Sequence, residues 1–280
     1  MTFSLLPDCL AARLLGSLHE VEQVVVAVEL STSIAAAARL RPDELNIRLG
    51  HLFEMHGIGL VTGEAGSGKT SATRRTVSAL HTGLYKVLYV CQSTGNVMDL
   101  YKSNDWELGL PSERNRTSLF RQIKNEVNRL SIESRCKPIL IIDEAHNLRT
   151  DVLEDLRLLT NYQMDAENRL CLLFIGQAEL HRRLSMAAYE SLSQRIVVRY
   201  HVASLLRAEL GQYLSHHLLR AGTKLPIFEP AAEEALFQET QALPRMVNSL
   251  AHHALMAAAV AKSKSVNPHN HSERRRRQSP

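Results

Sequence analysis

The sequence contains no long apolar segment. A membrane-spanning helix needs about 18 or more consecutive apolar residues, and no uncharged run of that length occurs. The first residues also lack the basic and small-residue pattern of a secretory signal. We therefore expect a soluble, cytoplasmic protein without a membrane span.

Cysteines, aromatic residues and net charge are all low. Cys9, Cys91, Cys136 and Cys171 are scattered without a C-x-x-C pair, so neither a zinc cluster nor a disulfide framework is indicated. Aromatic residues make up 5% of the chain, which argues against a stacking platform for single-stranded nucleic acid. The formal net charge is +4 and includes an arginine run at 274–277, so charge alone does not predict a DNA-binding protein.

The chain of 280 residues is long enough for one large domain or two modest ones. Its patterns divide it into four parts. Residues 1–42 form an N-terminal extension of unknown role, and residues 43–203 form the core. Residues 204–262 form a small helical domain. Residues 263–280 are polar and carry the arginine run, so we expect a disordered basic tail.

The core alternates between short apolar runs and amphipathic segments, which is typical of a parallel sheet with crossover helices. The expected strands are residues 58–62, 86–91, 138–142, 170–175 and 195–200. The expected helices are residues 44–55, 69–80, 97–108, 119–130 and 152–161. The sequence therefore predicts an α/β fold, a three-layer αβα sandwich around a parallel five-stranded sheet.

The strand pattern ends near residue 204. Helical patterns follow at residues 205–221, 230–240 and 244–261, and proline stands in the first turn of the last two. A small all-helical domain is predicted.

A glycine-rich motif follows the first expected strand. Gly63, Gly68, Lys69 and Thr70 match the pattern G-x-x-x-x-G-K-[ST], in which main-chain amides and a helix N-terminus cradle phosphates. Lys69 is expected to reach the β- and γ-phosphates of ATP, and the Thr70 hydroxyl to hold Mg²⁺. The predicted nucleotide-binding residues are Gly63, Glu64, Ala65, Gly66, Ser67, Gly68, Lys69, Thr70 and Ser71. The alternative is a glycine-rich turn without a ligand.

Two acids follow a wholly apolar strand. Asp143 is predicted to hold the magnesium ion together with Thr70, and Glu144 to polarise the water that attacks the γ-phosphate. The alternative is that these acids are a helix N-cap and a first-turn residue.

These two motifs resemble the Walker A and Walker B motifs of AAA+ ATPases. The stretch from 57 to 261 more narrowly resembles the general-secretion-protein-A-like ATPases, a group that includes helper ATPases of bacterial transposons. This narrower likeness is carried by the motifs Gly176-Gln177-Ala178-Glu179-Leu180, Gln194-Arg195-Ile196 and Leu243-Pro244-Arg245. The resemblance implies a P-loop NTPase core followed by a helical lid.

The resemblance also implies three further site residues. Gln177 is similar to the sensor-1 residue that helps to place the attacking water, with a loop glutamine as the alternative. Arg195 resembles the arginine that one subunit inserts into its neighbour's site, and Arg182 and Arg183 are rivals for that role. Arg245 is similar to the sensor-2 arginine of the lid. A surface ion pair and an ordinary first-turn arginine are the alternatives for Arg195 and Arg245.

Two parts of the sequence depart from simple expectations. His146 completes a D-E-A-H string, but one nucleotide-binding unit with a small lid leaves no room for the second motor lobe of a helicase. Residues 1–42 do not resemble the segment that contacts adenine in such ATPases, so the adenine contacts stay unassigned.

The resemblance favours a transposition helper, an ATPase that assembles as a ring or filament on double-stranded DNA and regulates a partner transposase. Basic side chains supply the sequence-independent part of DNA binding. The candidates are Lys102, Arg114, Arg116, Arg121 and Lys124. Their alternative is a solvated helix face.

Two other functions stay open. One is an accessory ATPase of a general secretion pathway, ranked second because such proteins are expected to carry a membrane span and a wall-binding part. The other is a nucleotide-switched binding module with little turnover.

Overall fold

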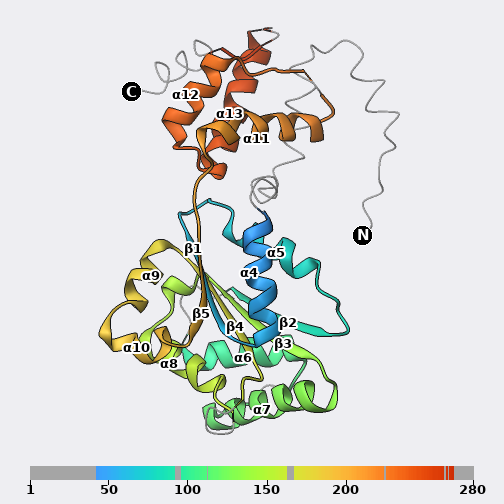
Figure 1. Cartoon of the computed structure of the whole chain (residues 1–280), viewed down its shortest axis with the longest axis vertical. Coiled ribbons are helices and arrows are strands. Elements are labelled where there is room, and N and C mark those ends of the chain that lie inside the picture. The colour runs from blue at the N-terminus through green and yellow to red at the C-terminus, as the bar shows by residue number, and fades with distance from the viewer. Residues whose placement is uncertain are drawn as a thin grey trace. The chain divides into compact units, whose positions relative to one another are not determined.

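The structure is a computed structural model. It describes residues 42–91, 96–111, 113–162, 167–223, 225–261, 263 and 265–267. The predicted N-terminal extension up to residue 41 and the predicted tail from residue 268 lie outside the described residues. The contacts of the chain separate two compact units, which meet in the sequence between Ala203 and Ser204 (Figure 1).

The first unit is built on a five-stranded sheet with the strand order β2-β3-β4-β1-β5, in which every neighbouring pair is parallel. The strands are β1 (Ile58–Gly63), β2 (Tyr85–Cys91), β3 (Lys137–Asp143), β4 (Cys171–Gly176) and β5 (Ile196–Val202). The five predicted strands are confirmed. β1, β3 and β4 are apolar and almost wholly buried, as expected for parallel strands covered on both faces.

Helices cover both faces of this sheet (Figure 1). They are α4 (Pro42–Met55), α5 (Lys69–Ser78), α6 (Val97–Leu108), α7 (Arg116–Asn128), α8 (Thr150–Leu159), α9 (Ala178–Leu184) and α10 (Glu190–Ser193). A π-helical turn, Arg129–Glu133, extends α7. The predicted three-layer sandwich is confirmed. Sequence analysis missed α9 and α10, which lie between β4 and β5.

The alternation of strand side chains creates two cores. Val61, Ile139 and Ile141 point to the face that packs on α4 and α5. Leu60 and Ile142 point to the opposite face, which packs on α6 to α9. The two-residue period of the strands thus gives each face its own apolar layer, and α5 packs on the face of Val61.

The second unit is helical, with α11 (Arg207–Arg220), α12 (Pro230–Thr240) and α13 (Pro244–Val260). Proline begins both α12 and α13, where its missing amide hydrogen costs no helical hydrogen bond. The core of this unit includes Tyr213, Leu236 and Val247.

Candidate active site

The loop between β1 and α5 requires glycine at three positions. Gly66 and Gly68 have φ of 85° and 95°, in the left-handed region that other residues rarely adopt. A Cβ on Gly63 would lie 2.5 Å from the carbonyl oxygen of Val202 and 2.7 Å from Oγ of Ser67. The motif glycines are therefore explained by backbone geometry and close packing.

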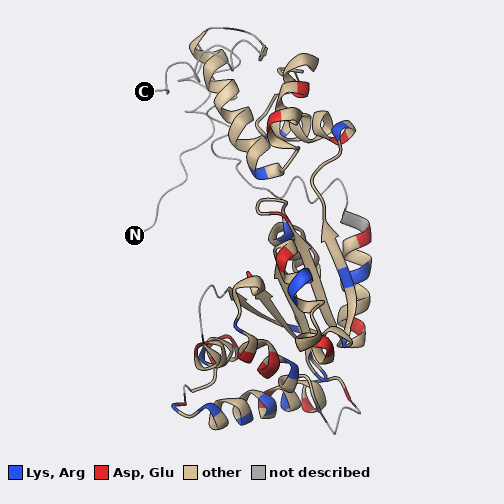
Figure 2. Ribbon diagram, turned by 90° about the vertical axis from the view of Figure 1, so that its left-hand side faces the viewer, with Lys and Arg blue, Asp and Glu red and all other residues tan. Residues whose placement is uncertain are grey.

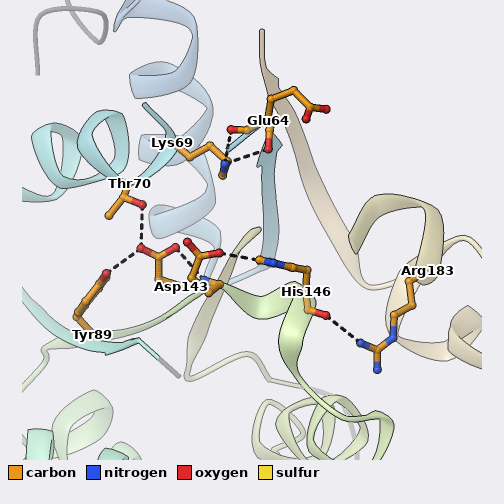
Figure 3. Close-up of polar contacts among 9 residues, drawn as sticks. Glu64, Lys69, Thr70, Tyr89, Asp143, His146 and Arg183 are labelled. Atoms are coloured by element: carbon orange, nitrogen blue, oxygen red, sulfur yellow. Dashed lines mark hydrogen bonds and ion pairs between the residues drawn. The ribbon is translucent and has the colours of Figure 1, made fainter. Parts of the chain in front are cut away.

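Lys69 begins α5, and only 7% of this residue is exposed. Its Nζ donates hydrogen bonds to the carbonyl oxygens of Gly63 (2.9 Å) and Glu64 (2.8 Å). The ammonium group thus lies against the loop that precedes its own helix (Figure 3). A buried cation at a helix N-terminus makes this end of the sheet strongly attractive to an anion.

The structure brings the two predicted metal residues together. Thr70 Oγ1 donates a hydrogen bond of 2.8 Å to Oδ2 of Asp143, although the two residues are 73 positions apart. Asp143 ends β3 and is 4% exposed. A hydroxyl and a carboxylate at this distance form an oxygen pair of the kind that Mg²⁺ prefers.

Asp143 has a further partner that sequence analysis missed. The hydroxyl of Tyr89 on β2 donates to Oδ2 of Asp143 at 2.7 Å (Figure 3). Burial and the neighbouring Asp143 raise the pKa of the Tyr89 phenol, so the hydroxyl keeps its proton and remains a donor. No local pattern reveals this contact, because it depends on β2 lying beside β3.

Glu144 follows β3 in the left-handed conformation, with φ of 53°. Its side chain is 45% exposed, and its Oε2 lies 3.4 Å from Nδ1 of His146. The helix after Glu144 is a three-residue 3₁₀ turn, Ala145–Asn147, without a side-chain cap. Glu144 stands at the N-cap position of this turn but makes no side-chain cap, and the Asp143 carboxylate faces Thr70.

Arg183 is held inside its own subunit. Its Nη1 donates to the carbonyl oxygens of Leu148 (2.5 Å) and His146 (3.3 Å), and its Nε donates to the Tyr189 hydroxyl (3.0 Å). These bonds fix the turn that carries Glu144, and they remove Arg183 as a rival for the inserted arginine.

Gln177 and Arg195 lie at opposite ends of the strands. Gln177 directly follows β4, whose last residue, Gly176, pairs with Thr62 of β1. Gln177 therefore lies at the carboxyl ends of the strands, where the phosphate loop also lies. Arg195 precedes β5, whose first residue pairs with Ile58 at the start of β1. The length of β1, roughly 16 Å, separates Arg195 from its own loop. The roles of both residues stay predictions.

Arg245 lies in the first turn of α13 and is exposed. It belongs to the helical unit, so its predicted role as sensor 2 is untested by the geometry of the core.

The predicted DNA-contacting residues fall into two groups. Lys102, Arg114 and Arg121 are exposed. Arg116 instead donates two hydrogen bonds to the buried Asp155, at 2.5 and 3.1 Å. Lys124 donates to the Asn161 carbonyl oxygen at 2.5 Å and lies 4.6 Å from the centre of a tyrosine ring.

Arg116 and Lys124 therefore each have a partner within the fold, although the Arg116 side chain is 57% exposed. The DNA-contacting role of all five residues stays a prediction. Basic and acidic residues are interspersed along the helices of the first unit (Figure 2).

Comparison with known proteins identifies the core. Residues 54–184 match the family model described as "AAA domain", and this stretch contains the phosphate loop together with Asp143 and Glu144. We call this stretch the AAA domain, after the family model that it matches. Among the described helices, none combines the length and apolar character of a membrane-spanning segment.

The similarity to one known protein extends beyond the AAA domain. The chain is 33% identical over 204 residues to "General secretion pathway protein A" of Aeromonas hydrophila. This match covers 72% of the present chain but 37% of that protein. The chain thus spans little more than a third of the relative's length.

Solved structures show the same fold at low identity. Cdc6p from Pyrobaculum aerophilum has a TM-score of 0.62 at 16% identity, covering 83% of this chain and 64% of that one. The ADP form of ORC2 from Aeropyrum pernix has a TM-score of 0.60 at 16% identity, covering 83% and 66%. ORC1 of the same organism, solved in complex with DNA, has a TM-score of 0.57 at 19% identity, covering 82% and 64%. The AAA domain therefore has the predicted P-loop NTPase fold.

Proposed function

We propose that the AAA domain binds ATP with Mg²⁺ and hydrolyses the ATP to ADP and phosphate. The observation that carries this proposal is the 2.8 Å hydrogen bond between Thr70 and Asp143. It places both predicted metal ligands beside the N-terminus of α5, where the buried ammonium of Lys69 lies.

The residues of the loop fit a triphosphate. A Cβ at Gly63 would collide with the loop, and Gly66 and Gly68 hold left-handed conformations that orient successive amides. Ser67 Oγ is buried without a hydrogen-bond partner among the described residues, which leaves it available to a ligand.

Each residue has a distinct part in the proposed reaction. The loop amides and Lys69 would hold the phosphates, and Thr70 and Asp143 would hold the metal. The ion would neutralise charge on the β- and γ-phosphate oxygens. Glu144 would accept a proton from the attacking water, which Gln177 would help to orient.

Nucleotide binding tests the proposal most directly. Wild-type protein should bind a fluorescent ATP analogue in the presence of Mg²⁺, and Lys69→Ala should weaken this binding at least about tenfold because a buried charge partner of the phosphates is lost. Lys86→Ala, which removes an exposed lysine of β2, is the control. Equal affinity of Lys69→Ala and wild type would contradict the assignment.

For the cellular role, the 33% identity to a secretion pathway protein supports an accessory ATPase of a general secretion pathway, with the AAA domain in the cytoplasm. From the sequence this role ranked second, because secretion ATPases are expected to carry a membrane span and a wall-binding part. The match covers 37% of the relative and carries no information about those parts. Loss of the protein should reduce protein export in the organism that carries it. Wild type should restore export and Lys69→Ala should not, whereas normal export without the protein would end this proposal.

A transposition helper is the second candidate. It is supported by the motif resemblance and by the exposed Lys102, Arg114 and Arg121. Binding of double-stranded DNA should then require ATP and weaken steeply with salt, and combined replacement of these three residues by alanine should reduce the salt slope. An absence of binding at low salt would remove this candidate.

A further inference from the structure

The carboxylate of Asp143 accepts three hydrogen bonds, which together fix its orientation. Oδ2 accepts from Thr70 (2.8 Å) and Tyr89 (2.7 Å), and Oδ1 accepts from the main-chain amide of Glu144 (2.8 Å). An ionised carboxylate has about four lone-pair sites. The remaining site is on Oδ1.

Strand pairing brings the Tyr89 hydroxyl to this position. In the register of β2 and β3, Tyr89 lies opposite Ile141, and Cys91 lies opposite Asp143. Tyr89 is therefore the diagonal neighbour of Asp143 on the same face of the sheet, a separation that a long aromatic side chain can span. The ring reaches across the strands and the hydroxyl meets the carboxylate.

Burial of the Tyr89 side chain does not explain why its hydroxyl points to Asp143. Tyr89 lies on the edge strand and is 42% exposed, so water could solvate its hydroxyl if the side chain turned outward. Asp143, in contrast, is 4% exposed and needs partners to fix its orientation. Groups that hydrogen-bond a metal ligand fix its rotamer and tune its affinity for the ion.

We propose that Tyr89 is a positioning residue that holds the Asp143 carboxylate in the orientation required for metal binding. This inference rests on the proposed ATP site. Tyr89 would not touch the metal; together with Thr70 and the Glu144 amide it holds the carboxylate in one orientation and leaves an acceptor site of Oδ1 open.

The substitution Tyr89→Phe tests the inference, because it removes the hydroxyl and keeps the ring. Mn²⁺ affinity would be measured by electron paramagnetic resonance in the presence of a non-hydrolysable ATP analogue. Tyr89→Phe should bind Mn²⁺ roughly tenfold more weakly, as expected when a partner of a metal ligand is lost. Affinity for the analogue without metal should stay unchanged.

Tyr85→Phe is the matched control. Tyr85 lies on the same strand and the same face, but its hydroxyl donates to Glu54 Oε1 at 2.5 Å, away from Asp143. This variant should keep wild-type Mn²⁺ affinity. In an Asp143→Ala background, Tyr89→Phe should cause no additional loss of Mn²⁺ affinity, because its partner is gone.

The outcomes are distinguishable. Equal Mn²⁺ affinity of Tyr89→Phe and wild type would overturn the inference while leaving the proposed function intact. Weaker binding of both Mn²⁺ and the metal-free analogue by Tyr89→Phe would also overturn it, because that pattern reports a general structural change. Failure of the wild type itself to bind Mn²⁺ with the analogue would instead overturn the proposed function.

Discussion

Oε2 of Glu144 lies 3.4 Å from Nδ1 of His146 across the turn that follows β3. The same turn is held by Arg183, which donates to the carbonyl oxygen of His146. The proposed base is thus carried by a fixed backbone, while its side chain remains 45% exposed. A general base needs both features, because it must contact the attacking water and keep a defined position.

Glu144→Gln should leave ATP bound and lower the rate of phosphate release at least about a hundredfold, because an amide cannot accept the proton. Single-turnover phosphate release measures the rate, and fluorescence of an ATP analogue measures binding. Normal release by the variant would show that the base is misassigned. Wild-type protein that binds ATP without measurable release would favour the nucleotide-switched binding module.

Arg183→Ala should destabilise the AAA domain by about 1–3 kcal/mol, because it leaves two part-buried carbonyl groups without the Arg183 donor. It also removes one of the two partners of the Tyr189 hydroxyl. Urea unfolding measures this change. Arg182→Ala is the control: Arg182 is the exposed neighbour, and its loss should alter the unfolding free energy by no more than about 0.5 kcal/mol. Equal stability of the two variants would contradict the structural role.

Asp105 should make the protein less stable as pH rises through the acid range. It is 1% exposed, and neither carboxylate oxygen has a hydrogen-bond partner among the described residues. Its pKa is raised from 3.8 to about 6, mainly by burial and to a smaller extent by the negative charge of Glu113. The folded state therefore binds more protons than the unfolded state between about pH 4 and 6, and stability falls across that window.

Replacing Asp105 by Asn should remove this pH dependence. The pKa of Asp105 differs by about two between the folded and unfolded states, which corresponds to about 3 kcal/mol. This is the upper limit of the gain in unfolding free energy expected for Asp105→Asn at pH 7. Urea unfolding at pH 4, 5, 6 and 7 measures it. Glu107→Gln removes an exposed acid of the same helix and should leave the pH profile unchanged. A profile of Asp105→Asn that matches wild type would refute the assignment.

Arg195 should act on a neighbouring subunit, because the length of β1 separates it from its own phosphate loop. Arg195→Ala and Glu144→Gln should each be inactive alone. Mixing them should restore part of the ATP hydrolysis, because some interfaces then join an intact Arg195 to an intact Glu144. Light scattering with an ATP analogue should show a ring or filament. A monomer under every condition would rule out this role.

The sequence alone determined the strands, most helices and the phosphate loop. Apolar runs such as 138–142 are buried on both faces, and the three glycines of the loop have local conformational or steric requirements. Proline marked the starts of α12 and α13. The short helices α9 and α10 escaped detection, since a segment of only a few residues shows too little of the helical period.

Only the tertiary structure decided which side chains meet. Tyr89 reaches Asp143 because β2 is the neighbour of β3. Arg183 donates hydrogen bonds to main-chain carbonyl oxygens of a turn more than thirty positions earlier in the chain. Arg116 and Lys124 have the same charge as the other basic candidates, yet they donate hydrogen bonds to Asp155 and Asn161 of the same chain. The physical reason is common to all four: the periodicity of a segment reports which face it buries, whereas a contact between distant segments depends on strand order, register and packing.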